Sequence, residues 1–214
     1  RRLLDREKAL TRLRDEIAEE RRALPRVAVE KDYSFEGENG SLSMLELFGN
    51  CSQLMIYHFM YSPDWDGGCT SCSFWADNFD GIDTHLAHRD ISFLAVSNAP
   101  FPTLQTYAQR FDWKFRWYST NGSGFSEDFG VTFGESERKQ NRIHYNYRDQ
   151  DFYTEELPGV SVFVRDADDG IFHTYSTYAR GLDILNGAYH YIDLAPRGRH
   201  EDDGMSWLRR KDEY

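Results

Sequence analysis

Two short, almost continuous apolar runs stand out along the chain, at residues 52–61 and 90–97. Runs of this length are typical of central strands that are covered on both faces of a sheet. Between them, residues 69–88 carry apolar side chains at spacings of three and four, which predicts one long helix with a single apolar face. The side chains on this face are Cys72, Trp75, Phe79, Ile82 and Leu86. A second helix is predicted over residues 98–111, where two prolines favour a helix start.

The order of these elements predicts an α/β fold, because strand, helix, strand and helix in succession join parallel strands through right-handed crossovers. Farther along, residues 160–165 and 171–175 flank Asp168-Asp169-Gly170, and Asp-Gly between two such runs is typical of an antiparallel hairpin. A final helix is predicted over residues 182–194. We therefore expect a sandwich in which helices flank a mixed central β-sheet.

The remaining segments give weaker patterns. Residues 26–50 predict a short strand, a turn at 37–40 and a small helix at 43–48. Residues 113–118 fit another short strand, whereas residues 141–150 are polar and rich in tyrosine and predict an irregular excursion.

The first 25 residues predict a helical arm attached to a domain over residues 26–214. The arm contains no glycine and ends at a proline, and its apolar residues recur near a seven-residue period. These residues are Leu3, Leu10, Leu13, Ile17 and Leu24. An exposed apolar stripe is unfavourable, so we expect the arm to pack on the domain or on a second copy, which would give a homodimer.

Composition and charge narrow the function classes. The chain has 214 residues, 40% of them hydrophobic, and a net charge of −11. This acidic balance argues against a nucleic-acid partner and against docking on an anionic membrane, since both need basic surfaces. No apolar run approaches the roughly 18–20 residues that span a bilayer. No secretory signal is visible, and three cysteines are too few for a disulfide scaffold, so a cytoplasmic location is expected.

Cysteine chemistry is predicted at Cys69-Thr70-Ser71-Cys72, which follows a glycine loop and opens the first predicted helix. Unpaired N–H groups and the positive end of the helix dipole meet there, and both stabilise a thiolate. In such motifs the pKa of the first cysteine falls from about 8.5 into the range of roughly 3.5–7.5. We therefore predict that Cys69 attacks a disulfide and that Cys72 resolves the resulting mixed disulfide.

Neighbouring residues leave some questions open. Cys51, before the first apolar run, is either a second resolving thiol or an inert buried cysteine. Asp64 and Asp66 precede Cys69, and their negative charge is expected to raise its pKa. The Cys69–Cys72 pair itself can also be inert.

Metal binding is the other interpretation of the pair. Two cysteines at this spacing are half of a zinc site, but no second C-x-x-C completes four ligands. His85 and His88 have a spacing that can ligate a metal, although such histidines near a helix end are typically solvated. The sequence therefore predicts no metal and no cofactor.

Several motifs resemble the DUF899 family of bacterial proteins. They are Tyr57-His-Phe-Met-Tyr-Ser-Pro-Asp-Trp65, Cys69-Thr-Ser-Cys-Ser-Phe-Trp-Ala-Asp77 and His173-Thr-Tyr-Ser-Thr-Tyr-Ala-Arg-Gly-Leu-Asp183, together with Arg21-Arg-Ala-Leu-Pro25 and Gly198-Arg-His-Glu201. The resemblance covers essentially the whole chain. It implies a thioredoxin-like fold and, by analogy, a dithiol–disulfide oxidoreductase that acts on a disulfide of a protein or a small molecule.

The chain departs from thioredoxin itself around the cysteines. Gly68 stands where thioredoxin has tryptophan, and the nearest upstream tryptophan is Trp65. Thioredoxin also places a cis-proline before the strand that faces its disulfide. Here Pro158 is the candidate, although counting back from the Asp-Gly turn puts Val160 or Ser161 at that point. Trp65, Pro158 and Val160 are therefore candidate substrate-binding residues.

His173 and Arg180 complete the candidate substrate-binding set. They belong to a segment that mixes Tyr, Thr, His and Arg in a way a plain hairpin does not need. This segment is expected either to line the entrance to the site, with Arg180 steadying a thiolate or an anionic substrate, or to be a structural segment whose side chains bind one another beside the last strand.

Two alternative functions remain. A peroxiredoxin-like thiol peroxidase is one, because Pro63 and Cys72 resemble the proline and the peroxidatic cysteine of that family. A non-catalytic binding protein of thioredoxin-like fold, assembled through the N-terminal arm, is the other.

Overall fold

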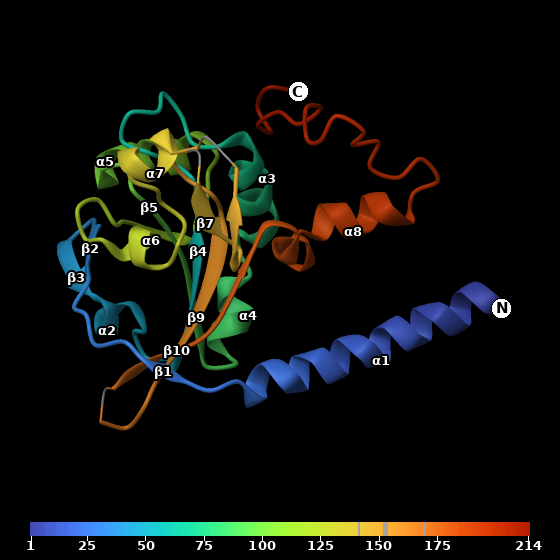
Figure 1. The fold of residues 1–214 in the computed structure, drawn as a ribbon, viewed down its shortest axis with the longest axis horizontal. Helices are drawn as coiled ribbons and strands as arrows, with labels where there is room; N and C mark the ends of the chain where they lie inside the picture. The colour runs from blue at the N-terminus through green and yellow to red at the C-terminus, as the bar shows by residue number, and fades with distance from the viewer. Residues whose placement is uncertain (141, 152–153, 169) are drawn as a thin grey trace.

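The computed structural model describes residues 1–214 apart from 141, 152, 153 and 169. In this described part, eight strands form one mixed sheet (Figure 1). Neighbouring strands follow the order β1 (Val27–Ala28), β10 (Ile171–Tyr178), β9 (Gly159–Arg165), β4 (Gln53–His58), β5 (Ile91–Ser97), β6 (Arg116–Ser119), β2 (Ser34–Gly37) and β3 (Gly40–Ser43). A separate hairpin pairs β7 (Ile143–Tyr145) with β8 (Arg148–Gln150).

Helices lie on both faces of the large sheet (Figure 1). They are α1 (Arg2–Ala23), α2 (Met44–Leu47), α3 (Thr70–Phe79), α4 (Asp83–Ala87), α5 (Phe101–Arg110), α6 (Phe125–Asp128), α7 (Glu135–Lys139), the 3₁₀ helix η1 (Ala179–Leu185) and α8 (Gly187–Leu194).

The central strands have thioredoxin-like connectivity. β4 is parallel to β5 and joined to it through α3 and α4, whereas β9 runs antiparallel to both β4 and β10. The order β10-β9-β4-β5 puts β4 in the middle of the sheet, directly before the cysteine pair. The predicted α/β sandwich with a mixed central sheet, flanking helices and a thioredoxin-like fold is confirmed.

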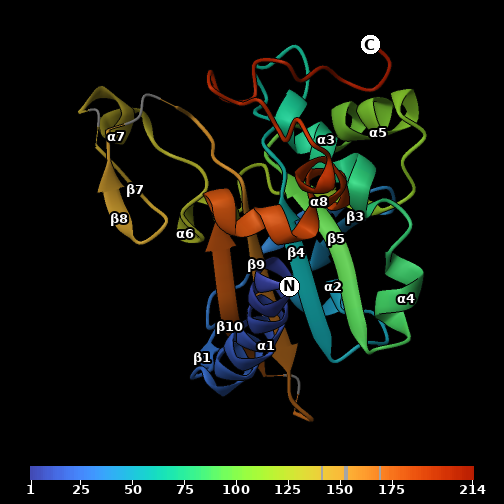
Figure 2. The same cartoon turned by 90° about the vertical axis from the view of Figure 1, so that its right-hand side faces the viewer.

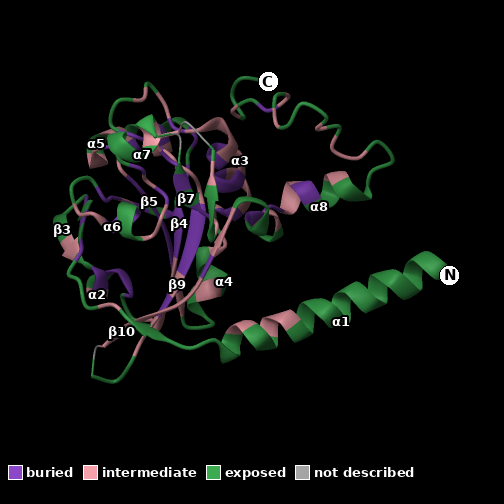
Figure 3. Cartoon of the chain, viewed as in Figure 1, coloured by how far each residue is buried: buried purple, intermediate pink, exposed green. Residues whose placement is uncertain are grey.

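Strand β4 separates two core layers, because its side chains alternate between the faces of the sheet. Tyr57 packs in the layer that holds α3 and α5, while Leu54 and Ile56 pack in the layer that holds α2 and α6. Buried residues concentrate in β4, β5 and α3 (Figure 3). The prediction that the two apolar runs are covered central strands is confirmed.

The predicted helix over residues 69–88 is wrong in one respect, because it breaks after Phe79. Asp80 has an extended backbone, and its carboxylate accepts hydrogen bonds from the backbone N–H groups of Lys114 and Phe115 at 2.7 and 3.1 Å. Gly81 follows with a φ of 87°, a left-handed conformation that glycine adopts without strain. These contacts end α3, and the chain resumes as α4.

Two further segments differ from expectation. The tyrosine-rich stretch predicted to be irregular contains the β7–β8 hairpin, in which Ile143 and Tyr145 are buried; its first residue lies outside the described part. The last predicted helix is divided into η1 and α8, because the Asn186 side chain accepts the N–H of Tyr189 and begins a new helix. The predicted β9–β10 hairpin is present, while Asp169 in its turn lies outside the described residues.

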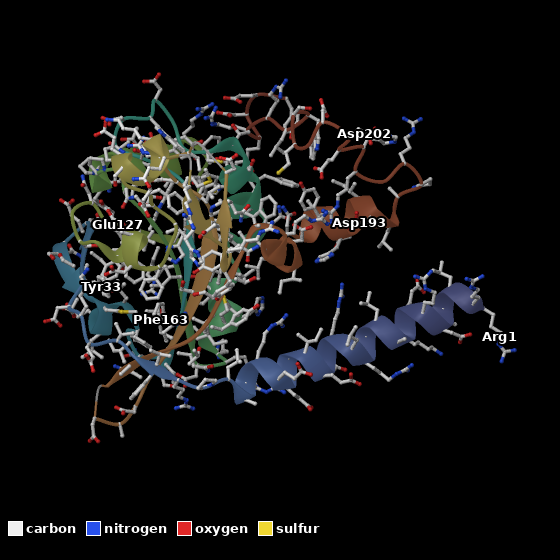
Figure 4. All side chains as sticks on the ribbon, in the orientation of Figure 1. Arg1, Tyr33, Glu127, Phe163, Asp193 and Asp202 are labelled. Carbon is white, nitrogen blue, oxygen red and sulfur yellow. The ribbon has the colours of Figure 1, made fainter. Side chains whose placement is uncertain are left out.

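Helix α1 extends away from the domain in Figure 1 and comes toward the viewer in Figure 2, and most of its side chains point into open space (Figure 4). None of its residues is buried, and Leu3 is 65% exposed. Contact with the domain occurs at its C-terminal end, where the guanidinium of Arg21 lies 5.4 Å from the Tyr175 ring centre. The predicted helix is therefore present without the predicted packing of its whole stripe on the domain. Its pairing with a second copy stays a prediction.

No helix in the described ranges is both long enough and apolar enough to cross a membrane.

Candidate active site

The cysteine pair is positioned by the end of β4 and the start of α3. Cys69 is the residue immediately before α3, and its backbone N–H donates to the Met60 carbonyl, 3.0 Å away. The Ser73 hydroxyl donates to the Cys69 carbonyl at 2.9 Å and so ties the first helical turn to the loop. Cys72 lies one turn into the helix and is buried. The strand and the helix therefore hold both sulfurs at one end of the sheet.

Gly68 explains the departure from thioredoxin before the first cysteine. A Cβ atom here would lie 2.8 Å from a ring carbon of Phe59 and 3.1 Å from Tyr107. Only glycine fits this close approach of the backbone to two aromatic rings. The Gly68 carbonyl in turn accepts hydrogen bonds from the Tyr107 hydroxyl at 3.0 Å and the Arg210 guanidinium at 2.9 Å. The loop is thus fixed from two distant parts of the chain.

The pKa values of the two thiols are shifted in opposite directions. The thiol of Cys72 donates a hydrogen bond to the Cys69 sulfur, and this bond is the largest of the effects that lower the pKa of Cys69 to about 6. The backbone N–H groups of Cys72 and Ser71 act in the same direction, while burial opposes them. Burial raises the pKa of Cys72 well above its usual value. At neutral pH, Cys69 is therefore a thiolate that accepts a hydrogen bond from the protonated thiol of Cys72.

Cys72 has two further donors directed at its sulfur. The backbone N–H of Met60 lies 3.4 Å from Sγ, and the hydroxyl of buried Tyr57 also hydrogen-bonds to it. Both interactions favour the ionised form of Cys72 and so partly offset its burial.

Asp64 and Asp66 do not dominate the acidity of Cys69. Both side chains are exposed on the loop, and the largest influences on the pKa of Cys69 are its hydrogen bond from Cys72 and its burial. The net shift of this pKa is downward, although the two carboxylates precede the cysteine.

A cavity of about 560 Å³ opens against both cysteines. Its floor is formed by Tyr57, Met60 and Trp75, and its walls by η1, α8 and the C-terminal segment, residues 199–205. Of the five predicted substrate-binding residues, Pro158 and Arg180 line this cavity. The peptide bond before Pro158 is trans, so the cis-proline of thioredoxin has no counterpart there. The Arg180 side chain is 85% exposed and paired with Asp183 at 3.0 Å, so its charge already has a carboxylate partner.

The other three predicted residues lie outside the cavity. The indole N–H of Trp65 donates to Glu155 at 3.1 Å, which fixes the loop before the cysteines. Val160 is buried in the core beneath α3. His173 hydrogen-bonds to Ser176 at 2.8 Å and packs against Phe129 and Phe163 in the opposite layer of the sheet. The structure therefore does not bring these three side chains to the cysteines.

Three residues near the site were missed from the sequence: Tyr57, Glu156 and Arg210. Glu156 is buried and accepts a hydrogen bond from Asn98 at 3.0 Å, and its burial raises the pKa of the carboxyl to about 8. The charge of Cys69 contributes in the same direction, which places this carboxyl within electrostatic range of the thiolate. Glu156 is therefore largely protonated at neutral pH.

The described residues provide no set of ligands for a zinc ion. Among the residues that the structure describes, no group of three or more His, Cys, Asp or Glu side chains is arranged to hold a metal ion. His85 and His88 are exposed on α4. Cys51 precedes β4, whereas Cys69 follows it, and the six residues of β4 span about 20 Å at roughly 3.3 Å each. Cys51 is too distant to resolve a disulfide at Cys69.

Arg210 is expected to stabilise the active-site loop. Arg210→Ala removes a hydrogen bond to the Gly68 carbonyl and another, of 2.7 Å, to the Tyr107 hydroxyl. Hydrogen bonds to charged groups contribute about 1.5–3 kcal/mol each, so a comparable loss in the free energy of unfolding is expected. Denaturant titration of the reduced protein measures it, with the exposed Arg197→Ala as the control. Equal stability of the two variants would show that the C-terminal segment does not hold the loop.

Comparison with known proteins identifies one family whose model matches the chain. The model of the family described as "Bacterial protein of unknown function (DUF899)" matches residues 1–214. No curated protein matches the chain.

Solved structures of similar fold include peroxidoxin BcpB from Mycobacterium tuberculosis, with 15% identity, a TM-score of 0.47, and coverage of 79% of this chain and 96% of that one. They also include a thiol:disulfide interchange protein from Bacteroides sp., with 12% identity, a TM-score of 0.47, and coverage of 84% and 97%. A peroxiredoxin Q variant from Xanthomonas campestris has 13% identity, a TM-score of 0.47, and coverage of 78% and 95%. The assignment of the site rests on the geometry of the cysteines in this chain.

Proposed function

We propose that this chain, which belongs to the DUF899 family of bacterial proteins of unknown function, is a thiol/disulfide oxidoreductase that works through Cys69 and Cys72. The observation that carries the proposal is the hydrogen-bonded pair itself. Cys69 is acidic, with a pKa of about 6, and Cys72 is buried beside it at the base of a cavity. A thiolate that is ionised at neutral pH and adjacent to a second thiol is suited to attack a disulfide and then to be released from it.

The reaction passes two electrons from the dithiol to the substrate. The Cys69 thiolate attacks one sulfur of the substrate disulfide, the substrate S–S bond breaks, and the first substrate thiolate leaves. Cys72 then loses its proton and attacks the Cys69 sulfur, which forms the Cys69–Cys72 disulfide and expels the second substrate thiolate. The Cys72 proton ends on one substrate thiolate, and the other substrate thiolate takes a proton from solvent. An external thiol reductant regenerates the dithiol, and no cofactor takes part.

The surroundings of Cys72 support the second step. The Met60 N–H and the Tyr57 hydroxyl both hydrogen-bond to its sulfur and stabilise the thiolate that must form there. Before attack, the Cys72 proton is shared with Cys69; once Cys69 is part of a mixed disulfide it no longer accepts that proton as a thiolate. We place this chemistry in the cytoplasm, since three cysteines do not form a scaffold of structural disulfides.

Thiol peroxidase activity is the alternative. Since Cys72, at the predicted peroxidatic position, is buried and its pKa is raised, a peroxidase reaction would have to use the Cys69 thiolate. It would convert Cys69 to a sulfenic acid, which dimedone traps, whereas the dithiol reaction passes through a mixed disulfide. The guanidinium groups at the cavity, Arg180 and Arg199, both bind Asp183. Neither is therefore directed at a peroxide on Cys69, and this arrangement favours the disulfide reaction.

Alkylation of Cys69 tests the proposal. With iodoacetamide, the rate at Cys69 is expected to rise with an apparent pKa of about 6, while Cys72 stays unmodified. Cys72→Ala removes the largest pKa-lowering interaction, so the apparent pKa should rise toward the 9.0 of an unperturbed thiol. Cys51→Ser is the matched control and should leave the curve unchanged. A Cys69 that titrates near 8.5 or above in the wild type would point to a non-catalytic binding protein.

A further inference from the structure

We infer that the substrate of the Cys69–Cys72 pair is a low-molecular-weight disulfide with an uncharged, apolar body, and not a disulfide of a folded protein. This inference rests on the proposed dithiol function. The cavity against the two sulfurs encloses about 560 Å³, which falls within the range of small-molecule sites. A protein disulfide instead needs a cysteine on an open or convex surface, where an extended segment can lie beside it.

The C-terminal segment supplies the outer wall of this cavity. It passes beside α3 and α8 (Figures 1 and 2), and Arg199, Glu201 and Met205 face the cavity. Since these residues share the cavity lining with the two cysteines, the broad surface of a folded protein would meet them on its approach to Cys69. A small molecule fits in the cavity beside them.

This wall is anchored along its length. The Arg199 guanidinium lies 3.8 Å from the centre of the Tyr189 ring, and Glu201 accepts hydrogen bonds from the Tyr189 hydroxyl at 2.7 Å and from Trp207 at 3.0 Å. Beyond them, Leu208 is buried and Arg210 binds the Gly68 carbonyl. The segment is therefore held at both ends, and displacing it breaks contacts with the active-site loop itself.

The side chains that line the cavity indicate the charge and polarity of the substrate. Apolar side chains form much of the lining and come from Met60, Trp75, Leu182 and Met205. The charged side chains of the lining are Arg180, Arg199, Asp183 and Glu201. Both arginines are bound to a carboxylate, because Asp183 contacts both guanidinium groups. Among the described residues of this lining, no guanidinium is therefore left unpaired for an anionic substrate, and a neutral apolar one is favoured.

The reaction balances for such a molecule. One symmetrical disulfide R–S–S–R and the Cys69–Cys72 dithiol give two R–SH molecules and the Cys69–Cys72 disulfide. The apolar R groups occupy the cavity while the Cys69 thiolate attacks the nearer sulfur. The Ser71 hydroxyl, which hydrogen-bonds to Cys69, holds the thiolate in position at the cavity edge.

Three disulfides test the inference: dipropyl disulfide, the dianionic 3,3′-dithiodipropionate of similar size, and insulin. Rapid quenching and mass spectrometry measure the rate at which each disulfide oxidises the dithiol. Each rate is normalised by dividing it by the rate at which the same disulfide oxidises dithiothreitol at the same pH. Dipropyl disulfide is expected to exceed each of the others by at least about 10-fold, since burial of a few methylene groups alone discriminates by this much.

A cavity variant provides the second measurement. Met205→Trp fills part of the cavity and should slow dipropyl disulfide by about 10-fold or more, whereas Tyr191→Trp, on the exposed face of α8, should not change the rate. The Met205→Trp protein must still show the wild-type pKa of Cys69 in the alkylation assay. A normalised rate that is higher with insulin or with the dianion overturns the inference and leaves the dithiol function standing. Failure of all three to oxidise the dithiol overturns the dithiol function itself.

Discussion

Replacing Cys72 with serine is expected to stop turnover and to leave Cys69 joined to one half of its substrate as a stable mixed disulfide. Serine preserves the size of the side chain and its position above Tyr57, but it cannot attack the Cys69 sulfur. Loss of one member of a concerted pair typically costs about 10³-fold or more in rate. Intact mass spectrometry after exposure to a small disulfide should show one added substrate thiol on Cys69, removable by dithiothreitol.

The matched variants separate the roles of the three cysteines. Cys69→Ser should give neither turnover nor an adduct, because the remaining Cys72 is buried and its pKa is raised well above the usual value. Cys51→Ser should behave as the wild type, since Cys51 lies at the other end of β4. An adduct on Cys72 in the Cys69→Ser protein would reverse the assignment of attacking and resolving thiols. Turnover by Cys72→Ser that vanishes when Cys51 is also replaced would make Cys51 the resolving thiol.

The sequence predicts those parts of this fold that local patterns determine. Strands β4 and β5 are nearly continuous apolar runs, so burial on both faces follows from composition alone. The break between α3 and α4 does not follow in this way. It depends on the Asp80 carboxylate, which binds backbone N–H groups more than thirty residues away, at Lys114 and Phe115. Helical periodicity continues through the break, because Ile82 and Leu86 still pack on the same core layer.

The candidate site likewise contains residues that local sequence patterns predict and residues that only contacts between distant segments bring together. The position of the cysteine pair at a helix start is visible in the sequence because strand, glycine loop and helix are contiguous. Tyr57 is hidden within an apolar run, where a tyrosine is ordinarily a core residue. Arg210 reaches Gly68 across 142 residues of sequence. His173 and Val160 were assigned to the site by their place near a hairpin, but side-chain alternation along the strands directs them elsewhere.

Glu156→Gln is expected to abolish a fall in stability between pH 6.5 and 8. The native pKa of Glu156 is about 8 because of its burial, whereas the unfolded chain releases this proton near pH 4.5. Between these values the native state binds more protons than the unfolded state, so the free energy of unfolding falls as the pH rises. Below pH 6.5, buried His58 opposes this fall in the free energy of unfolding. Its pKa is lowered to about 3, so between pH 3 and 6.5 the unfolded state binds the imidazole proton more tightly and the native state gains stability as the pH rises.

The window above pH 6.5 isolates Glu156 once the redox cysteines are removed. Cys69, with its lowered pKa, would otherwise stabilise the native state as the pH rises, so both proteins carry Cys69→Ser and Cys72→Ser. In that background the free energy of unfolding should fall by about 2 kcal/mol from pH 6.5 to 8, at 1.36 kcal/mol per pH unit. Adding Glu156→Gln should flatten the profile, because the amide keeps an acceptor for Asn98 and does not titrate. Urea titrations at a series of pH values measure the slope.

The same residue bears on the reactivity of Cys69. A protonated Glu156 adds no negative charge near the thiolate, whereas an ionised one would oppose its formation. Glu156→Gln should therefore keep the pKa of Cys69 near 6 and remove any decline in thiolate reactivity above pH 8. An unchanged slope of stability between pH 6.5 and 8 in the glutamine variant would mean that Glu156 is already ionised in the native protein. The Cys69 thiolate would then form beside a standing negative charge, and its alkylation should titrate well above pH 6.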